Sequence, residues 1–214
     1  MSTGRSNRNL LTGSGFNSLV MEAVVARSDA ELMLRVKDGD EESFANLLSK
    51  HRDPVVNYLY RMVQNAAVAE ELAQDVFLRV YRARSTYEPT AKFTTWLYRI
   101  ATRVALNFLR DGRVARAAVP LEGPTGELLP ELRTHEPTVE DRLVAAVRAR
   151  EIRSAILALP EKQRAAVILH KYQELDYRQI AASLGCSESA VKSLLFRAYE
   201  SLRVRLSHLA GGRS

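Results

Sequence analysis

Residues 177–197 read YRQIAASLGCSESAVKSLLFR, a pattern of two short helices joined by a tight turn. Ala181 is small enough to let two helices cross closely, and Gly185 can adopt the left-handed backbone conformation that a side chain resists. Ser187 is placed to cap the second helix. The residues expected to pin the second helix to the first are Val191, Leu194 and Ala198. This spacing predicts a DNA-binding helix-turn-helix.

The second helix of this motif is expected to enter the major groove with its outward side chains. Those side chains are Glu188, Ser189, Lys192, Ser193 and Arg197. A helical hairpin that does not bind DNA is the alternative, and the cations Arg203 and Arg205 further along the chain argue against it. Cys186, the single cysteine, cannot form an internal disulfide and is expected to be inert.

Charge is distributed unevenly over the 214 residues, whose formal net charge is +6. Residues 29–75 hold ten acidic and five basic side chains, whereas residues 76–111 hold two acidic and seven basic ones. Residues 141–214 add thirteen basic and seven acidic side chains. One acidic and two basic surfaces indicate a protein that holds DNA twice and a protein partner as well. Solvated helices with uneven charge are the simpler alternative.

Two helix-rich blocks flank an irregular segment rich in proline and glycine. We therefore predict an all-α fold with two helical domains joined by a flexible linker, the second domain containing the helix-turn-helix. The predicted boundaries are a disordered tail at 1–27, a first domain at 28–111, a linker at 112–137, a second domain at 138–209 and a tail at 210–214. Met21 is an alternative start. No apolar stretch reaches the roughly 20 residues that a membrane-spanning helix needs.

Four helices are expected in the first domain from the helical spacing of its apolar residues. They run from Asp29 to about Gly39, from Glu41 to Val63, from Ala67 to Arg84 and from Thr94 to Arg110. Pro54 is expected to kink or divide the second of them. Thr94 or Thr95 is expected to cap the fourth.

The fourth helix carries a basic stripe, because Arg99, Arg103, Asn107 and Arg110 are spaced four, four and three residues apart. The opposite, core-facing stripe consists of Leu97, Ala101, Val104 and Phe108. Trp96 falls beside the basic row, where an indole can stack on an opened base step. In the preceding loop Lys92 lies near two aromatic residues, of which Tyr87 is the better candidate for a base contact and Phe93 for the core.

The third helix carries an acidic face formed by Glu70, Glu71, Gln74, Asp75 and Leu78. Complementing the helix dipole explains the first two acids but not the residues one turn further in. The face therefore predicts a docking site for a basic helix of another protein. Apart from His51 this domain holds no histidine or cysteine, and the chain has no glycine-rich phosphate loop. We expect no catalytic residue, no metal site and no cofactor.

Both blocks together resemble the extracytoplasmic-function group of the sigma-70 family. The first block matches through EELAQDVFLRVYR at 70–82 and FTTWLYRIA at 93–101. The second matches through Leu159-Pro160 with Arg164, and then through YRQIA, LGCS and VKS within 177–193. The resemblance covers about residues 29–206 in the family's order. One departure is Leu194, where many members have arginine, and this puts a −35 contact at that position in doubt.

The resemblance implies a factor that binds core RNA polymerase and directs it to promoters, and that is not an enzyme. The β′ coiled coil would dock on Glu71, Gln74 and Asp75, with Leu78 beside them, and the β flap on the apolar surface around Leu159 and Leu169. The −10 element would be bound by Tyr87, Lys92, Trp96, Arg99, Arg103 and Asn107, to which the basic stripe adds Arg110. The −35 element would be recognised by Glu188, Ser189, Lys192, Ser193 and Arg197.

The family further implies a cytoplasmic protein, an anti-sigma factor as an additional partner, and neither a small-molecule substrate nor membrane insertion. The alternative function is that of a stand-alone helix-turn-helix transcriptional regulator. Such a regulator needs no polymerase docking site and leaves the face at residues 70–78 unexplained.

Overall fold

The computed structural model describes residues 28–115 and 139–210, and in these ranges every regular element is a helix. The elements are α2 (Asp29–Lys37), α3 (Glu41–Val63), α4 (Ala66–Arg82), the 3₁₀ helix η1 (Ala83–Thr86), α5 (Phe93–Ala115), α6 (Val139–Leu157), α7 (Glu161–Tyr172), α8 (Tyr177–Leu184), α9 (Glu188–Arg205) and α10 (Ser207–Ala210). The all-α prediction is confirmed. The predicted tail at 1–27 and the predicted linker from residue 116 onward lie outside the described residues.

Helices α2, α3 and α4 begin where the side chains of Ser28, Asp40 and Asn65 accept hydrogen bonds from free backbone N–H groups. Ser28 and Glu31 form a reciprocal capping box on α2. The Asp40 side chain accepts a hydrogen bond from the Ser43 backbone N–H of α3, which lowers the pKa of Asp40. Of the two alternatives predicted for Pro54, division of the helix is excluded, because α3 runs through Pro54 as one helix.

The start of α5 differs from the prediction, because the helix begins at Phe93 and not behind a threonine cap. Thr95 lies inside the first turn, where its backbone N–H donates to the Lys92 carbonyl at 3.0 Å. Deeper in the first unit, Tyr58 Oη and Thr102 Oγ1 lie 2.8 Å apart and join α3 to α5. At its other end α5 continues through Gly112 to Ala115, since one glycine costs a helix only about 1 kcal/mol.

The helix-turn-helix, α8 and α9, has the local structure that its sequence predicts. Asp176 caps α8, Gly185 ends it in the left-handed conformation with φ of 64°, and Ser187 caps α9. Val191 and Ala198 are buried, as predicted. Leu194 is only half-buried, and the central packing position between these two residues belongs to Leu195.

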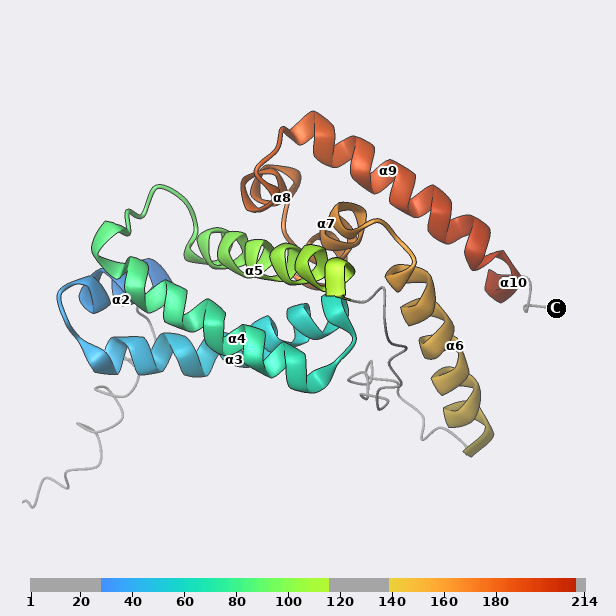
Figure 1. The fold of residues 1–214 in the computed structure, drawn as a ribbon, viewed down its shortest axis with the longest axis horizontal. Coiled ribbons are helices and arrows are strands. Elements are labelled where there is room, and N and C mark those ends of the chain that lie inside the picture. Colours follow the sequence, from blue (N-terminus) through green and yellow to red (C-terminus); the bar gives the residue numbers. More distant parts are fainter. Residues whose placement is uncertain (1–27, 116–138, 211–214) are drawn as a thin grey trace, which may run out of the picture.

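The two units pack against each other, a contact that the sequence did not predict. Helix α7 contacts α3 and α5 of the first unit as well as α8 and α9 of its own unit, and α8 packs along α5 (Figure 1). Six consecutive residues of α7, 164–169, are consequently buried. A single cluster of buried side chains extends through both units. Helix α6, by contrast, projects away from the rest (Figure 1).

Candidate nucleic-acid interface

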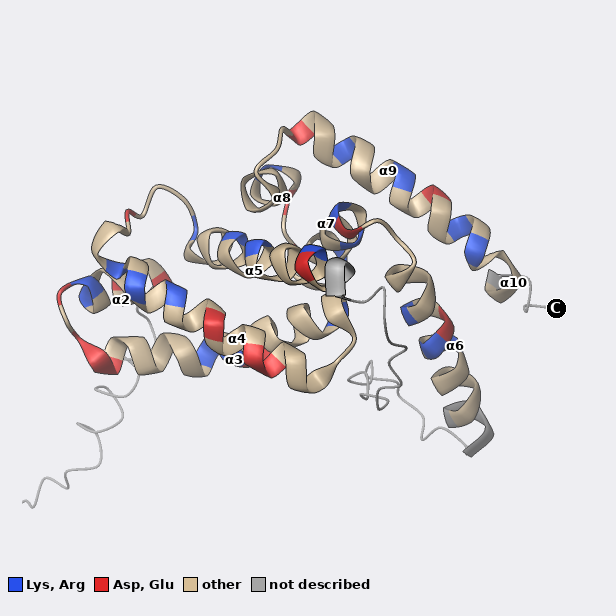
Figure 2. Cartoon of the chain, in the orientation of Figure 1, with Lys and Arg blue, Asp and Glu red and all other residues tan. Residues whose placement is uncertain are grey.

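The N-terminal half of α9 presents all of the side chains predicted to recognise duplex DNA. Glu188, Ser189, Lys192, Ser193 and Arg197 are each exposed. The position of the helix is fixed by Val191 and Leu195 beneath it, which are buried. The cations of α9 are distributed along its outer side (Figure 2). Polar side chains therefore lie exposed on one face, which is what recognition of base edges requires, and the Ser193 hydroxyl also donates to the Ser189 carbonyl at 3.1 Å.

Phe196, on the same helix, was not among the residues predicted to face DNA. Its side chain is 69% exposed, although a phenylalanine is ordinarily buried. Its immediate neighbour Leu195 is only 2% exposed. The sequence signal that could have identified it is an aromatic residue directly after the core position of a recognition helix.

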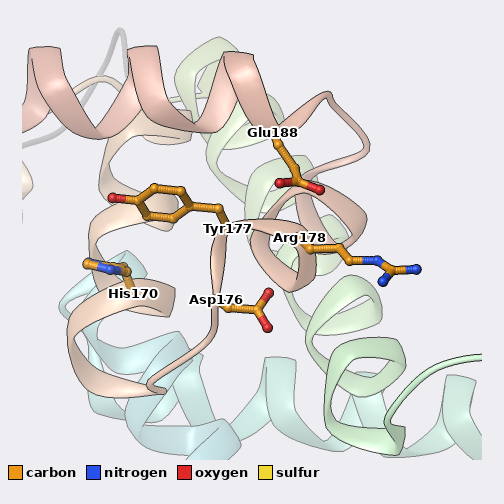
Figure 3. A pocket seen from close by; sticks show the side chains of 5 residues that line it. All are labelled: His170, Asp176, Tyr177, Arg178 and Glu188. Carbon is orange, nitrogen blue, oxygen red and sulfur yellow. The ribbon is translucent and has the colours of Figure 1, made fainter.

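A shallow pocket lies next to the N-terminus of α9 (Figure 3) and was not predicted. It is lined by His170, Asp176, Tyr177, Arg178 and Glu188. The rings of His170 and Tyr177 lie 5.5 Å apart, and His170 Nδ1 lies 3.0 Å from Tyr199 Oη. These contacts join α7 to both helices of the helix-turn-helix. Arg178 extends toward solvent beside the helix predicted to enter the groove (Figure 3).

The basic stripe of α5 is present and accessible. Arg99, Arg103 and Arg110 are exposed, whereas Trp96 and Asn107 are half-buried. On the core side Leu97, Ala101 and Val104 are buried as predicted, and Phe108 is only half-buried. Lys92, at the entry to the helix, is exposed. Guanidinium groups arranged in this way can bind a series of phosphates.

Tyr87 is a correction to the predicted site, because its side chain is only 2% exposed. Its ring packs edge-on against Trp96, with 5.0 Å between the ring centroids, and also against Phe93. Burial raises the pKa of Tyr87, and the charge of Asp29 raises it further. Helix α2 also reaches this residue, because Lys37 Nζ donates to the Tyr87 carbonyl at 3.3 Å, and no local pattern shows that contact. It supports Trp96 from below and does not offer its own ring to a base.

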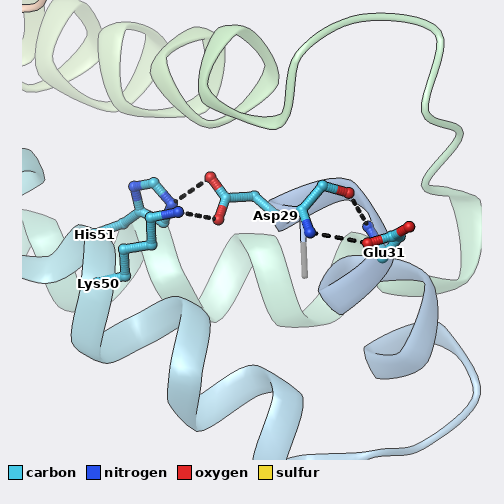
Figure 4. A network of polar contacts seen from close by, with 5 residues as sticks. Asp29, Glu31, Lys50 and His51 are labelled. Atoms are coloured by element: carbon cyan, nitrogen blue, oxygen red, sulfur yellow. Dashed lines mark hydrogen bonds and ion pairs between the residues drawn. The ribbon is translucent and has the colours of Figure 1, made fainter. Parts of the chain in front are cut away.

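A polar network joins α2 to α3 (Figure 4). The Asp29 carboxylate accepts a hydrogen bond from Lys50 Nζ at 2.7 Å and lies 3.0 Å from His51 Nε2. The His51 ring in turn packs against Phe93 at 5.3 Å. Burial lowers the pKa of His51, an effect that Asp29 opposes and Lys50 reinforces. Neither Asp29 nor His51 was predicted from the sequence to have a role.

The predicted docking face of α4 is accessible to a partner. Glu71 and Gln74 are exposed, Leu78 is 53% exposed, and Asp75 is half-buried with an ion pair of 2.9 Å to Arg79. Beside it, a groove of about 690 Å³ runs between α3 and α4. The groove is lined by Glu41, Phe44, Ala45, Leu48, Arg52, Glu70, Ala73, Gln74, Phe77, Leu78 and Tyr81. An apolar floor with carboxylates at its rim suits an amphipathic helix that carries basic side chains.

The surface expected around Leu159 and Leu169 is not available, because both side chains are buried. Leu159 lies in the α6–α7 turn and Leu169 in α7, and both side chains belong to the cluster of buried residues that extends through both units. Exposed apolar side chains that are available in their place include Leu143, Val144 and Val147 on α6. Among the described residues no cluster of histidine, cysteine and carboxylate side chains could hold a metal ion. No described helix could span a membrane.

Fold and surfaces together define a two-unit helical protein with a helix-turn-helix and a separate cationic helix. Residues 47–114 match the family model for sigma-70 region 2, and residues 149–202 match the model for sigma-70 region 4. The chain is 31% identical to the ECF RNA polymerase sigma factor SigW of Bacillus subtilis, over 82% of this chain and 95% of that protein. It is 33% identical to the RNA polymerase sigma factor CarQ of Myxococcus xanthus, over 83% and 97%.

The chain therefore belongs to the sigma-70 family of RNA polymerase sigma factors, in its extracytoplasmic-function group. Two solved structures share its fold at 20% sequence identity. CnrH, in complex with the cytosolic domain of CnrY, has a TM-score of 0.62 and covers 85% of this chain and 99% of its own. RpoE, in complex with the anti-sigma factor NepR from Bartonella quintana, has a TM-score of 0.59 and covers 80% and 99%.

Proposed function

We propose that this sigma factor binds core RNA polymerase and directs it to promoters by contacting a −35 element with α9 and a −10 element with α5. The observation that carries the proposal is the uninterrupted exposed row on α9, Glu188, Ser189, Lys192, Ser193 and Arg197, on a helix held by a helix-turn-helix. In this mechanism the protein performs no covalent chemistry. Opening of the DNA is driven by the binding energy of bases and phosphates on the protein surface.

At the −35 element α9 would lie in the major groove of duplex DNA. Lys192 and Arg197 can donate to acceptors on guanine or to phosphates, while Glu188 can accept from the cytosine amino group. The half-buried Leu194 supplies no polar group where many family members have arginine. Specificity at that position would therefore rest on its neighbours.

At the −10 element the arginines of α5 would hold the DNA backbone beside Trp96. The indole is supported from below by Tyr87 and Phe93, with ring centroids 5.0 and 5.9 Å from its own. A rigid, half-exposed aromatic ring is suited to stack on an unstacked base. Because Arg99 and Arg103 bind phosphates in this proposal, DNA binding should weaken steeply as salt concentration rises.

For polymerase docking, the face of α4 and its adjoining groove would receive the β′ coiled coil through Glu71, Gln74, Asp75 and Leu78. The exposed apolar side chains of α6 are a surface of the second unit that is available to the β flap. The two solved structures named above are complexes with a CnrY domain and with an anti-sigma factor. We infer that an anti-sigma factor also regulates this chain, in the cytoplasm.

The proposal is tested by in vitro transcription with core RNA polymerase and a library of promoters with randomised −35 and −10 elements. We expect transcripts that depend on this chain and share an upstream and a downstream element. The Lys192→Ala variant should lose them, whereas Lys162→Ala, an exposed lysine on α7, should keep them. A chain that binds DNA but does not co-purify with core polymerase would instead be a stand-alone regulator.

A further inference from the structure

The groove between α3 and α4 leaves apolar side chains in contact with water. At one end of it the rings of Phe44 and Tyr81 pack together, with 5.0 Å between their centroids. At the other end Arg52 and Glu70 form an ion pair of 2.7 Å. Between these ends Leu78 is 53% exposed. An open apolar groove on a rigid helix pair indicates a surface that an apolar segment covers.

Carboxylates at the rim of the groove restrict which segment fits. Glu41 lines the groove at its Phe44 end, and Glu71 lies on the exposed side of α4 next to Glu70. Neither Glu41 nor Glu71 forms an ion pair with another residue that the structure describes. A fitting segment therefore carries apolar side chains together with a cation, and no carboxylate of its own.

The chain itself contains such a segment ahead of α2, outside the described residues. Residues 8–20 begin with a cation, Arg8, and contain no acidic residue. Phe16, Leu19 and Val20 follow at a spacing that puts three apolar side chains on one face of a helical turn. The composition of this segment therefore matches both the apolar groove and its acidic rim.

The segment can reach the groove from the point at which the described chain begins (Figure 4). The Asp29 carboxylate accepts a hydrogen bond from Lys50 Nζ at 2.7 Å, which fixes the start of α2 beside α3. Lys50 lies about 200° around α3 from Arg52, on the side away from the groove. The chain must therefore pass half-way around a helix about 10 Å across, a path of about 16 Å. The eight residues from Val20 to Ser28 span up to about 26 Å, which is enough.

Attachment to the same chain makes even a weak contact effective. A segment on a short tether has an effective concentration of about 1 mM at its site. If the free segment had a dissociation constant of about 0.2 mM, the groove would be open in only about one chain in six. The apparent affinity of any other ligand of the groove would fall by the same factor. A weak internal ligand is therefore sufficient to regulate the groove.

We propose that residues 8–20 of this chain occupy the groove between α3 and α4 and compete with core polymerase for it. Phe16, Leu19 and Val20 cover the apolar side chains of the groove, and Arg8 lies near its acidic rim. Polymerase binding then requires displacement of the segment. The competition rests on the proposed docking of polymerase on α4, whereas occupation of the groove does not.

Photo-crosslinking of the full chain tests occupation of the groove. Phe16 is replaced by p-benzoylphenylalanine, which keeps an aromatic side chain, and the crosslinked peptides are identified by mass spectrometry after irradiation. We expect crosslinks within one chain, to the peptides of α3 and α4 that line the groove. Leu78→Arg should abolish them, whereas Val204→Arg, at an exposed apolar residue of α9, should keep them. Crosslinks to other parts of the chain, or between two chains, overturn the proposal.

The affinity of the labelled full chain for core polymerase, measured by fluorescence anisotropy, tests the competition. Phe16→Asp combined with Leu19→Asp should raise this affinity about sixfold, because carboxylates are disfavoured in an apolar groove with an acidic rim. Val24→Asp combined with Val25→Asp is the matched control, because it adds the same charge to the tether and should leave the affinity unchanged.

The two proposals fail in different ways. An unchanged affinity in the Phe16→Asp, Leu19→Asp chain overturns the competition. The docking face on α4 still stands in that case if charge reversal at Gln74 and Asp75 weakens polymerase binding. If crosslinks map to the groove but neither pair of substitutions changes the affinity, polymerase docks elsewhere, and both the docking face and the competition are overturned.

Discussion

The guanidinium group of Arg164 donates a hydrogen bond of 2.6 Å to the backbone carbonyl of Met62, which connects α7 of the second unit to the end of α3 in the first. The same group donates to the carbonyls of Leu157 and Leu159 in the α6–α7 turn. Arg164 is buried, so these carbonyls replace the hydrogen bonds to water that its charged guanidinium group loses on folding. One side chain thus orders the α6–α7 turn and holds the two units together.

Arg164→Ala should lower the free energy of unfolding by about 3 kcal/mol, because three buried carbonyls lose a charged donor. Urea denaturation followed by circular dichroism measures the change. The control is Arg178→Ala, an exposed arginine on α8 whose loss should cost no more than about 0.5 kcal/mol. Equal stabilities of the two variants would show that the Arg164 hydrogen bonds contribute little.

The two units should separate when a large side chain is introduced on the face of α8 that packs against α5. Ser183 is buried there, and its hydroxyl lies 3.4 Å from the Thr95 carbonyl. Ser183→Arg places a long cation at this contact, so the units should separate while each keeps its helices. Small-angle X-ray scattering should then show a larger radius of gyration with unchanged helical content.

Ala182→Arg provides the comparison, because residue 182 precedes Ser183 on the same helix and is exposed. Its radius of gyration should stay at the unmodified value. An unchanged radius for Ser183→Arg as well, in a protein that melts at the same temperature, would contradict the packing of α8 on α5. Tyr98, which donates to Gln173 across the same boundary, adds a polar contact that must also break.

Charge reversal on α4 should separate polymerase binding from folding. Gln74→Arg combined with Asp75→Arg places two cations on the face proposed to receive a basic helix. We expect affinity for core polymerase to fall about tenfold or more, measured by fluorescence anisotropy of the labelled chain. Asp38→Arg is the control, since Asp38 is an exposed acid at the end of α2, away from that face. Equal losses in both variants would remove the case for a specific docking face.

The helices and turns could be predicted well from the sequence, because residues within or next to each of them determine where it begins and ends. Gly185 and Ser187 determine the turn and the cap from their own backbone preferences, and the structure places them as expected. The exposed row on α9 follows from helical spacing alone. Tyr87 and Leu169 could not be placed correctly, because both are buried by segments distant in the chain. Phe196 was passed over because an aromatic residue on a helix usually faces the core.

His51 should make the stability of the first unit depend on pH. Burial lowers its folded-state pKa below the ordinary value of 6.5, so the unfolded chain binds the proton more readily. The free energy of unfolding should therefore fall as the pH drops from about 6.5 toward the folded-state pKa, and should be fully recovered above that window. Urea denaturation at about pH 7.5 and about pH 5.5 measures the difference.

In His51→Gln this contribution to the pH dependence should disappear, because glutamine can still contact Asp29 but does not titrate. His208→Gln should keep the full dependence, since His208 is 60% exposed and its contact with Glu151 is screened by solvent. Asp29→Asn should enlarge the difference between the two pH values, because Asp29 is the group that opposes the lowering of the His51 pKa. If Asp29→Asn reduced that difference, His51 would have to be charged in the folded chain, with its ion pair to Asp29 outweighing its burial.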